Sequence, residues 1–180
     1  VTQTRPQGNL TPASGDFTTS YTYDDAGQVT GVSNDLPMAV SYAYDPVGNL
    51  IAETDANGNT TAWAYDIRNR VLLRTDALGN EQAFTYDAIG NLRSATDSLG
   101  RTTAFEYDLL QRRLRTVFAD GTSQTAAYDE AGNLTLRADE LGHAVRYAFD
   151  PLNRRSAVQF PDGGTQTMAY DAAGWMIRST

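Results

Sequence analysis

The sequence predicts an all-β protein built as an array of antiparallel β-hairpins. A tyrosine–aspartate pair recurs every 21 residues along most of the chain. Each repeat also holds two turn signals, and the runs between them are rich in Thr, Val, Leu and aromatic residues. Such runs, separated by turns about every 8 to 12 residues, are typical of strands in a meander. A period between about 20 and 50 residues indicates a repeat architecture in which each unit packs on its neighbours.

The repeating unit consists of a tyrosine, an aspartate and, three residues later, a glycine, as in 44–50. The tyrosine and aspartate positions are filled by Tyr23 and Asp24, Tyr44 and Asp45, Tyr65 and Asp66, Tyr86 and Asp87, Tyr107 and Asp108, Tyr128 and Asp129, Phe149 and Asp150, and Tyr170 and Asp171. The glycine position is filled by Gly27, Gly48, Asn69, Gly90, Gln111, Gly132, Asn153 and Gly174. We interpret these residues as a structural motif and expect no catalytic residue among them.

The order of residues in the unit predicts a tight hairpin turn. An aspartate at the first turn position accepts a hydrogen bond from the backbone two residues later, which favours a type I turn. The glycine then adopts a left-handed conformation and closes a three-residue loop. Asn69 and Asn153 suit this position because Asn tolerates the left-handed region. Gln111 does not fit the pattern.

A second turn signal follows each tyrosine by 11 residues. Its clear copies are 55–58, 76–79, 97–100 and 139–142, and its weaker copies contain Asp120 and Gly121, Asp162 and Gly163, or Asp35 and Pro37. An odd repeat length would reverse the face of every side chain unless one residue per repeat leaves the ladder. We therefore expect a four-residue loop or a bulge in the second connection, which absorbs Asn59, Asn80, Arg101 or His143.

Large and small side chains alternate in the run before each tyrosine. The position two residues before the tyrosine holds Tyr21, Tyr42, Trp63, Phe84, Phe105, Ala126, Tyr147 and Met168. A period of two places these side chains and the motif tyrosines on one side of the sheet, here called the aromatic face. Small residues such as Ala62 and Ala64 occupy the other side.

The turn geometry also predicts which residues lie opposite the tyrosines. A three-residue loop pairs Tyr44 with Leu50, Tyr65 with Val71 and Tyr86 with Leu92, and such aromatic–aliphatic pairs stabilise a sheet by roughly 0.2–1 kcal/mol each. In two repeats the partner is an arginine: Arg113 opposite Tyr107 and Arg155 opposite Phe149. For these two we expect cation–π contacts.

Composition excludes several classes of function. The chain of 180 residues has no cysteine, and all 14 basic residues are arginine, so thiolate metal sites, cysteine nucleophiles and lysine Schiff bases are absent. A net charge of −8 disfavours a nucleic-acid partner. No run of about 18 apolar residues and no signal peptide is present, so we expect no membrane insertion by this segment.

Three other groups suggest chemistry, and each has a simpler interpretation. Residues 55–59 carry oxygen ligands at alternate positions, like the start of a calcium loop, but the bidentate glutamate is absent and turn capping is favoured. His143 is the only histidine and sits beside a turn glycine, so we expect neither a metal nor a cofactor there. The arginines at 112, 113 and 115 are interpreted as a solvated or stacked face.

The aromatic row supports two interpretations. In the structural one, each tyrosine ring packs on the sheet and keeps its hydroxyl in water. In the alternative, exposed rings stack on sugars and the chain is an extracellular carbohydrate-binding or adhesion module. Tyr42, Trp63 and Trp175 would then contact the glycan.

The repeated units YDPVGNL, YDAIGNL and YDEAGNL resemble the YD repeats, also called RHS repeats. That family includes bacterial Rhs and wall-associated polymorphic toxins, shell components of insecticidal toxin complexes, and teneurins. The resemblance covers about residues 19–180, which we read as about eight repeats, with 1–18 as a degenerate or partial repeat. It implies a curved or spiralling sheet that is part of a β-shell around a C-terminal toxin or effector polypeptide.

From this resemblance we expect a non-enzymatic wall segment of a larger, secreted or cell-surface bacterial protein. Its partners would be the rest of the shell, the enclosed polypeptide and, through open sheet edges, other copies of itself. The family also has a self-cleaving aspartyl site with a DPxG element. Residues 45–48 and 150–153 resemble it superficially, but both lie in ordinary repeat register, which favours a turn.

Overall fold

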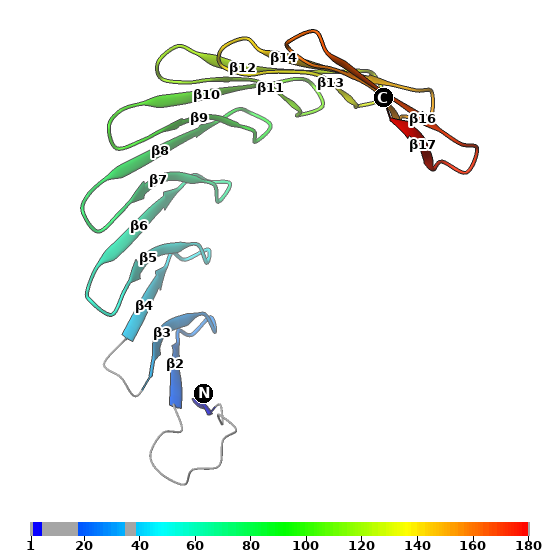
Figure 1. The fold of residues 1–180 in the computed structure, drawn as a ribbon. Helices are drawn as coiled ribbons and strands as arrows, with labels where there is room; N and C mark the ends of the chain where they lie inside the picture. The colour runs from blue at the N-terminus through cyan, green and yellow to red at the C-terminus, as the bar shows by residue number, and fades with distance from the viewer. Residues whose placement is uncertain (1, 5–17, 35–38, 180) are drawn as a thin grey trace. The chain divides into compact units, whose positions relative to one another are not determined.

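The computed structural model describes residues 2–4, 18–34 and 39–179 (Figure 1). The described residues form 17 β-strands and no helix, joined as consecutive antiparallel hairpins. The all-β, antiparallel prediction is confirmed. The predicted partial repeat at 1–18 and the turn signal at Asp35 and Pro37 lie largely outside the described residues. Within that first part, only the strand at residues 2–4 is described, paired with the strand that begins at residue 18.

The chain divides into two compact units, residues 1–84 and 85–180, and β8 (Glu81–Tyr86) runs through the division. The first unit contains β1 (Thr2–Thr4), β2 (Thr18–Tyr23), β3 (Val29–Ser33), β4 (Ala39–Tyr44), β5 (Leu50–Thr54), β6 (Thr60–Tyr65) and β7 (Val71–Thr75). The second contains β9 (Leu92–Thr96), β10 (Thr102–Tyr107), β11 (Arg113–Val117), β12 (Ser123–Tyr128), β13 (Leu134–Ala138), β14 (Ala144–Phe149), β15 (Arg155–Gln159), β16 (Thr165–Tyr170) and β17 (Met176–Ser179).

Both turns of a repeat have the same hydrogen-bond pattern. In the first turn, Asp45 N donates to Asn49 O and Gly48 N donates to Asp45 O. In the second turn, Asp55 N donates to Asn59 O and the glycine N again donates to the first carbonyl. The predicted four-residue second loop is therefore wrong: Asn59, Asn80, Arg101 and His143 all close loops of the same type as the first turn.

A β-bulge in the first hairpin removes the odd residue from the ladder. Tyr44 lies opposite Leu50, but Ala43 lies opposite Ala52, so Ile51 has no partner in this register. The second hairpin of the repeat runs without a shift. The same shift follows the turns after Tyr23, Tyr65, Tyr107, Tyr128, Phe149 and Tyr170. One bulge per 21 residues keeps the tyrosines of successive repeats on one face.

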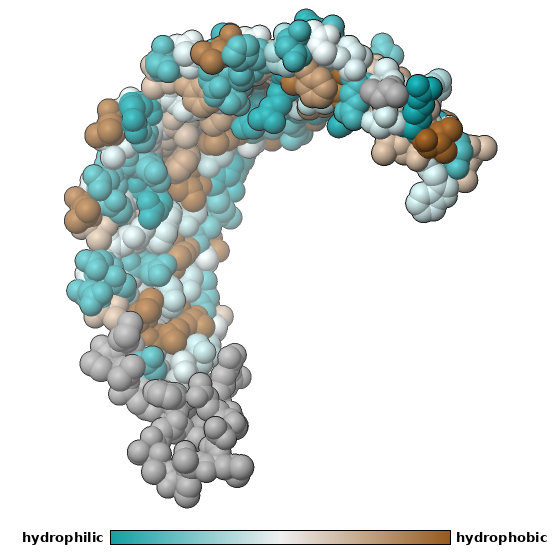
Figure 2. Space-filling view, viewed as in Figure 1, coloured by the Kyte–Doolittle hydropathy of each residue, from teal (hydrophilic) through white to brown (hydrophobic). Residues whose placement is uncertain are grey.

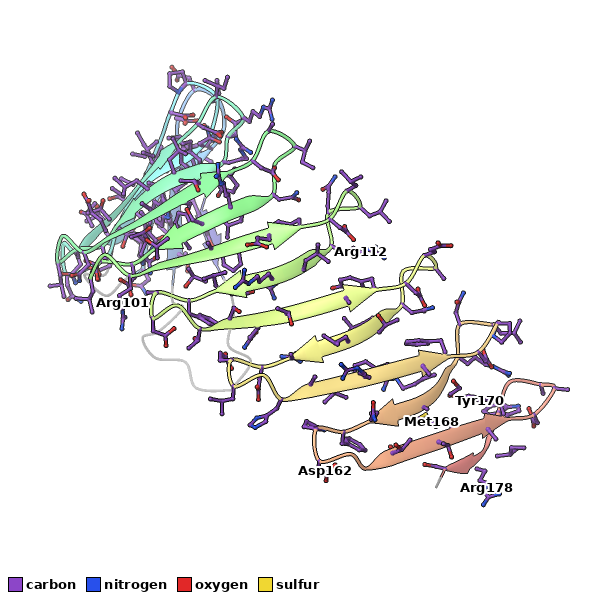
Figure 3. The ribbon with its side chains drawn as sticks, turned by 90° about the horizontal axis from the view of Figure 1, so that it is seen from above. Arg101, Arg112, Asp162, Met168, Tyr170 and Arg178 are labelled. Carbon is purple, nitrogen blue, oxygen red and sulfur yellow. The ribbon has the colours of Figure 1, made fainter. Side chains whose placement is uncertain are left out.

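Each unit is a single layer, with side chains on both of its faces (Figure 3). Strand β4 shows the consequence, since its residues alternate between exposed and half-buried. Among the described residues only Thr116, at 7% exposure, and Val158, at 5%, are buried. Apolar side chains are therefore covered mainly by their neighbours on the same face of the sheet and not by a second layer.

Apolar side chains also project from the turns. Ile67 is fully exposed and Leu109 is 98% exposed, and further aliphatic residues occupy other turns. Figure 2 shows isolated hydrophobic side chains, in brown, among hydrophilic ones on the surface. These positions contribute little to the stability of an isolated unit, because they bury almost no apolar area.

Candidate functional site: turns and aromatic face

The structure places the motif residues at equivalent points in the first turn of each repeat. Each motif tyrosine, and Phe149 in its repeat, ends an even-numbered strand from β2 to β16. The following aspartate starts the turn, and the glycine-position residue has a positive φ. The motif thus occupies one end of the strands.

The motif aspartate organises its turn through both carboxylate oxygens. Asp45 Oδ1 accepts hydrogen bonds from Val47 N at 3.0 Å and from Asn49 N at 2.8 Å. Asp45 Oδ2 accepts one from Asn49 Nδ2 at 2.8 Å. The side-chain hydrogen bond from Asn49 is the largest cause that lowers the pKa of Asp45. The predicted turn chemistry is confirmed, and the carboxylate is held ionised in a purely local role.

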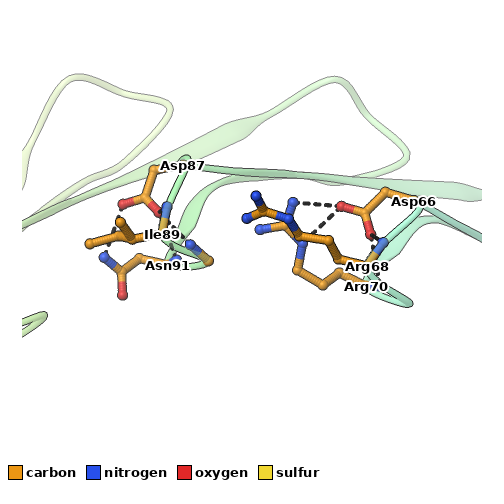
Figure 4. A network of polar contacts seen from close by, with 7 residues as sticks. Asp66, Arg68, Arg70, Asp87, Ile89 and Asn91 are labelled. Atoms are coloured by element: carbon orange, nitrogen blue, oxygen red, sulfur yellow. Dashed lines mark hydrogen bonds and ion pairs between the residues drawn. The ribbon is translucent and has the colours of Figure 1, made fainter.

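In alternate repeats an arginine takes the place of the asparagine. Arg70 Nε and Nη2 donate to Asp66 Oδ2 at 2.8 and 2.6 Å, while Arg68 N donates to Oδ1 at 2.8 Å (Figure 4). The hydrogen bond from Arg70 is the main cause that lowers the pKa of Asp66 from 3.8 to about 2. In the second unit, Asp87 Oδ1 accepts from Ile89 N at 3.1 Å and from Asn91 N at 2.8 Å (Figure 4).

The second turn at Asp55 uses its oxygens in the same way. Asp55 Oδ1 accepts from Asn57 N and Asn59 N, and Oδ2 accepts from Asn59 Nδ2 at 2.9 Å. The turn-capping interpretation of residues 55–59 is therefore confirmed. In the part of the chain that the structure describes, no three His, Cys, Asp or Glu side chains gather closely enough to hold a metal ion.

Three residues other than glycine adopt the left-handed conformation. Asn69 has a φ of 61°, Gln111 of 63° and Asn153 of 59°. Gln111 keeps the hydrogen bond of its turn, since Gln111 N donates to Asp108 O at 3.0 Å. The turn therefore forms in spite of the unfavourable residue, at a cost in backbone energy of roughly 1–2 kcal/mol.

The tyrosine hydroxyls connect successive repeats, which sequence reasoning missed. Tyr44 Oη donates to Val29 O at 3.0 Å and Tyr65 Oη donates to Leu50 O at 2.8 Å. Tyr170 Oη donates to Arg155 O at 2.7 Å. The hydroxyls of these repeats thus bond directly to the sheet, a role that the prediction did not include. Each acceptor lies next to the bulge, where the ladder is interrupted, so the hydroxyl satisfies a carbonyl that the bulge displaces.

Two cation–π contacts involve different rings from those predicted. Arg113 lies opposite Tyr107 as expected, but its guanidinium carbon is 5.7 Å from the centre of the Phe105 ring. Arg155 lies opposite Phe149, and its guanidinium carbon is 4.7 Å from the Tyr147 ring. The long side chain reaches diagonally to the ring two residues earlier on the same face, which cross-strand geometry permits.

These two arginines lie in the repeats that contain the two buried residues. Thr116 is opposite Phe105 and Val158 is opposite Tyr147. In both repeats the ring that the arginine stacks on lies opposite the buried residue, so the stacked arginine and the buried residue share one aromatic side chain.

In the six repeats that begin at positions 44 to 149, the residue five positions after the motif aromatic alternates between asparagine and arginine, whereas the first and last repeats have Gln28 and Trp175. The series runs Asn49, Arg70, Asn91, Arg112, Asn133 and Arg154. Two of the asparagines bond to the left-handed asparagine of the next repeat: Asn49 Nδ2 to Asn69 Oδ1 and Asn133 Nδ2 to Asn153 Oδ1, both at 2.9 Å. This alternation was visible in the sequence and could have indicated a structural unit of two repeats.

The arginines of this series contact the next repeat differently. The Arg112 guanidinium lies 4.6 Å from the centre of the Tyr128 ring, and its Nη1 donates to Asp129 O at 3.2 Å. Arg154 lies 4.6 Å from the Tyr170 ring and donates to Asp171 O. Figure 3 shows Arg112 at one end of the strands, with Arg101 and Asp162 at the opposite end. Asn49, Arg112, Asn133 and Arg154 therefore each join their repeat to the next one.

The three candidate sugar-binding residues do not form one cluster. Tyr42 and Trp63 are half-buried on the aromatic face of the first unit, opposite Glu53 and Arg74. Trp175 is 75% exposed and belongs to the last first-type turn of the second unit. The packing of Tyr42 and Trp63 in the ladder favours a structural role for them.

The remaining candidates lie in turns. His143 Nδ1 is 3.0 Å from Asp139 Oδ2, inside its own turn. The carboxylates of the two DPxG-like segments are engaged locally, Asp45 by Asn49 and Asp150 by Arg154. Arg115 Nη1 is 3.8 Å from Glu106. Within the described residues there is no helix that could span a membrane.

Comparison with solved structures identifies the fold. The crystal structure of TcdB2-TccC3 aligns with a TM-score of 0.68 at 19% identity, and covers 90% of this chain. A structure of the Photorhabdus luminescens Tc holotoxin pore, with a mutation in TccC3, aligns with a TM-score of 0.66 at 19% identity and covers 91%. The chain spans only 11% of the length of each of these proteins. No curated relative matches the sequence.

The family comparison agrees with the two-repeat spacing. The RHS Repeat family model matches residues 44–81, 86–123 and 128–165. Each match begins at a motif tyrosine and contains one asparagine-type and one arginine-type turn. Because these matches cover more than half of the sequence, the chain belongs to the RHS repeat family.

Proposed function

We propose that the chain is a structural wall segment of a shell that encloses a C-terminal toxin or effector polypeptide. The observation that carries this proposal is a single-layer sheet in which the motif aspartates shape each turn, while tyrosine hydroxyls and turn asparagines bond to the neighbouring repeat. A wall needs lateral continuity and two accessible faces, and this architecture has both within each unit. Membership of the RHS repeat family and the likeness to toxin-complex structures support the proposal.

The proposed wall segment is not an enzyme. The carboxylates of Asp45 and Asp66 accept hydrogen bonds from their own turns, which lowers their pKa and stabilises the ionised form, in keeping with a structural role. In this proposal the chain acts within a larger, secreted or cell-surface protein. Its partners are the remaining shell and the enclosed polypeptide.

Protease protection tests the enclosure. The natural polypeptide that contains this chain is treated with a nonspecific protease, and cleavage of the segment that follows the repeats is timed. As a control, the same segment is produced without the repeats. We expect cleavage to be at least about tenfold slower in the intact protein, because an enclosed chain is cut only when its shell opens. Equal cleavage rates would refute enclosure.

A second experiment addresses self-cleavage. Asp45→Asn and Asp150→Asn, singly and together, should leave the intact mass and any processing of the natural polypeptide unchanged. Loss of a processing product in either variant would contradict the proposal that these aspartates only shape turns. Asp66→Asn, which alters a turn without a DPxG-like sequence, is the matched control.

Open strand edges suggest that the isolated chain associates with itself. Among the described residues, β17 pairs with β16 alone, and its outer backbone groups are free to pair with another strand. We expect sedimentation velocity to show concentration-dependent association. A stable monomer over a hundredfold concentration range would exclude this contact.

A further inference from the structure

One repeat of the second unit lacks the large side chain that the others carry on the aromatic face. The position two residues before the motif tyrosine is Ala126, whereas the repeats on either side have Phe105 and Tyr147. Ala126 lies on β12, opposite Arg137 of β13. A methyl group here leaves the space of one ring empty.

The structure contains a hollow of about 520 Å³ at this place. Ala126 lines it together with Tyr107, Arg113, Leu114, Tyr128, Leu134 and Arg137. Register places Tyr107 with Arg113, Tyr128 with Leu134, and Ala126 with Arg137 as opposite pairs. The hollow is therefore built on the aromatic face by four consecutive strands, β10 to β13.

The charge of this hollow differs from that of the whole chain. Its lining includes arginines but no Asp or Glu, although the chain has 22 acidic residues. Among the described residues, neither Arg113 nor Arg137 forms an ion pair. Two acids reach lining residues from outside: Glu140 Oε1 accepts from Gln124 Nε2 at 2.6 Å, and Glu106 Oε1 lies 3.8 Å from Arg115 Nη1. A neighbouring hollow is instead lined by three acids: Asp87, Glu106 and Asp108.

We propose that the Ala126 hollow binds an anionic group carried on an apolar ring, such as an aromatic carboxylate. The ring would occupy the space that Phe105 and Tyr147 fill in the adjacent repeats, against Leu114, Leu134 and the two tyrosine rings. The anion would pair with the exposed guanidinium groups of Arg113 and Arg137, which match a carboxylate geometrically.

Two sources present this chemistry: a small aromatic acid, or an acidic–aromatic stretch of polypeptide. The test uses N-acetylphenylalanine, its uncharged amide, and the peptide acetyl-Glu-Phe-Glu-amide as probes. Each is titrated into the full-length ¹⁵N-labelled chain, and amide shifts are followed. Shifts with N-acetylphenylalanine indicate the small acid, and shifts with the peptide alone indicate a polypeptide ligand.

The expected shifts lie in residues 113–116, 124–128 and 134–137, and binding of the uncharged amide should be weaker. Ala126→Phe restores the pattern of the other repeats, so it should abolish these shifts without lowering the melting temperature. Arg137→Gln should weaken binding about threefold to tenfold, as expected for loss of a solvent-exposed charge-assisted contact. Arg146→Gln, an exposed arginine opposite Leu136 on the other face, is the matched control and should have no effect.

Three results would overturn the proposal: absence of shifts with every probe at about 10 mM, unchanged binding in Ala126→Phe, or equal weakening by Arg137→Gln and Arg146→Gln. The Arg137→Gln measurement remains decisive if the phenylalanine variant folds poorly. Protease protection of a following segment does not depend on any of these results, so the wall proposal and this site can fail separately.

Discussion

Gln111 is the residue whose conformation conflicts most with its type. It holds a φ of 63° in a position that other repeats give to Gly or Asn. We predict that Gln111→Gly stabilises the chain by about 0.5–1 kcal/mol, since relief of the left-handed strain exceeds the extra entropy of an unfolded glycine. Urea denaturation measures the change.

The control for this variant is Gln82→Gly. Gln82 is exposed on β8, where a glycine only weakens the strand, so this change should destabilise by about 0.5–1 kcal/mol. If Gln111→Gly also destabilised the chain, the Gln111 side chain would have to make a stabilising contact that outweighs the strain.

The tyrosine hydroxyl provides a second prediction. Tyr65→Phe removes only the donor to Leu50 O, so it should cost about 0.5–1.5 kcal/mol. Phe149 is the natural counterpart that lacks a hydroxyl, and Phe149→Tyr should recover part of that amount if the new hydroxyl reaches the equivalent carbonyl. Denaturation of both variants checks the pair, and opposite signs are expected. A neutral Tyr65→Phe would mean that water replaces the hydroxyl without loss.

Prediction from sequence succeeds at the turns because their chemistry is local. Asp45 accepts hydrogen bonds from backbone groups two and four residues away, so the motif contains both the acceptor and the donors that shape the turn. The hydroxyl bonds of Tyr44 and Tyr65 could not be predicted in the same way. Their acceptors lie 15 residues earlier and are exposed by a bulge whose position depends on the register between strands.

At the scale of the element, the contact between successive turns is specific to residue type. Asn133 contacts Asp129 in its own turn and Asn153 in the next one. We predict that a double-mutant cycle of Asn133→Ala and Asn153→Gly shows a coupling of about 0.5–1 kcal/mol, which is the contribution of their direct hydrogen bond. Glycine keeps the left-handed backbone at residue 153, so the cycle isolates the side-chain contact.

The matched cycle pairs Asn133→Ala with Gln111→Gly. No hydrogen bond joins these two residues, so their effects should add within about 0.5 kcal/mol. Equal coupling in both cycles would show that Asn133 acts through the general stability of the unit and not through a bond to the next turn.

The sequence predicts that each repeat contains one unpaired residue, but it does not predict which of the two hairpins contains it. The 21-residue period requires one unpaired residue per repeat, and the structure has one, in the first hairpin. The period does not distinguish the first turn from the second, because both run from Asp to Gly with the same hydrogen bonds. At Ile51 the bulge is accompanied by a bond from the tyrosine hydroxyl of the next repeat to Leu50 O, a contact that the sequence of a single turn does not contain.

At the scale of the whole molecule, many aspartates share one dependence on pH. The pKa of Asp66 falls from 3.8 to about 2 on folding, and those of Asp45, Asp55, Asp76, Asp97 and Asp129 are also lowered, in each case chiefly by a side-chain hydrogen bond. A carboxyl with a lowered folded-state pKa stabilises the fold above its unfolded value, and this contribution is lost as pH falls through the folded value.

We therefore predict that the urea midpoint is constant from pH 7 to about 5 and falls between about pH 4 and 2. The Asp66 carboxyl, followed by NMR, should titrate at the low end of this range. A midpoint that stays unchanged down to pH 2 would show that the turn hydrogen bonds are equally strong with protonated carboxyls.

The thin core leads to the last prediction. Because each hairpin contacts only its neighbours, removal of a buried group should lower stability locally rather than throughout the chain. Val158 is the most buried apolar residue, packed between β14 and β16 and lying opposite Tyr147. Val158→Ala should cost about 1–2 kcal/mol and should increase hydrogen exchange in β14 to β16 while β10 to β12 keep their protection. Thr116→Ala, at the equivalent position two repeats earlier, should give the reverse pattern, and uniform loss of protection in both variants would instead require a single cooperative core.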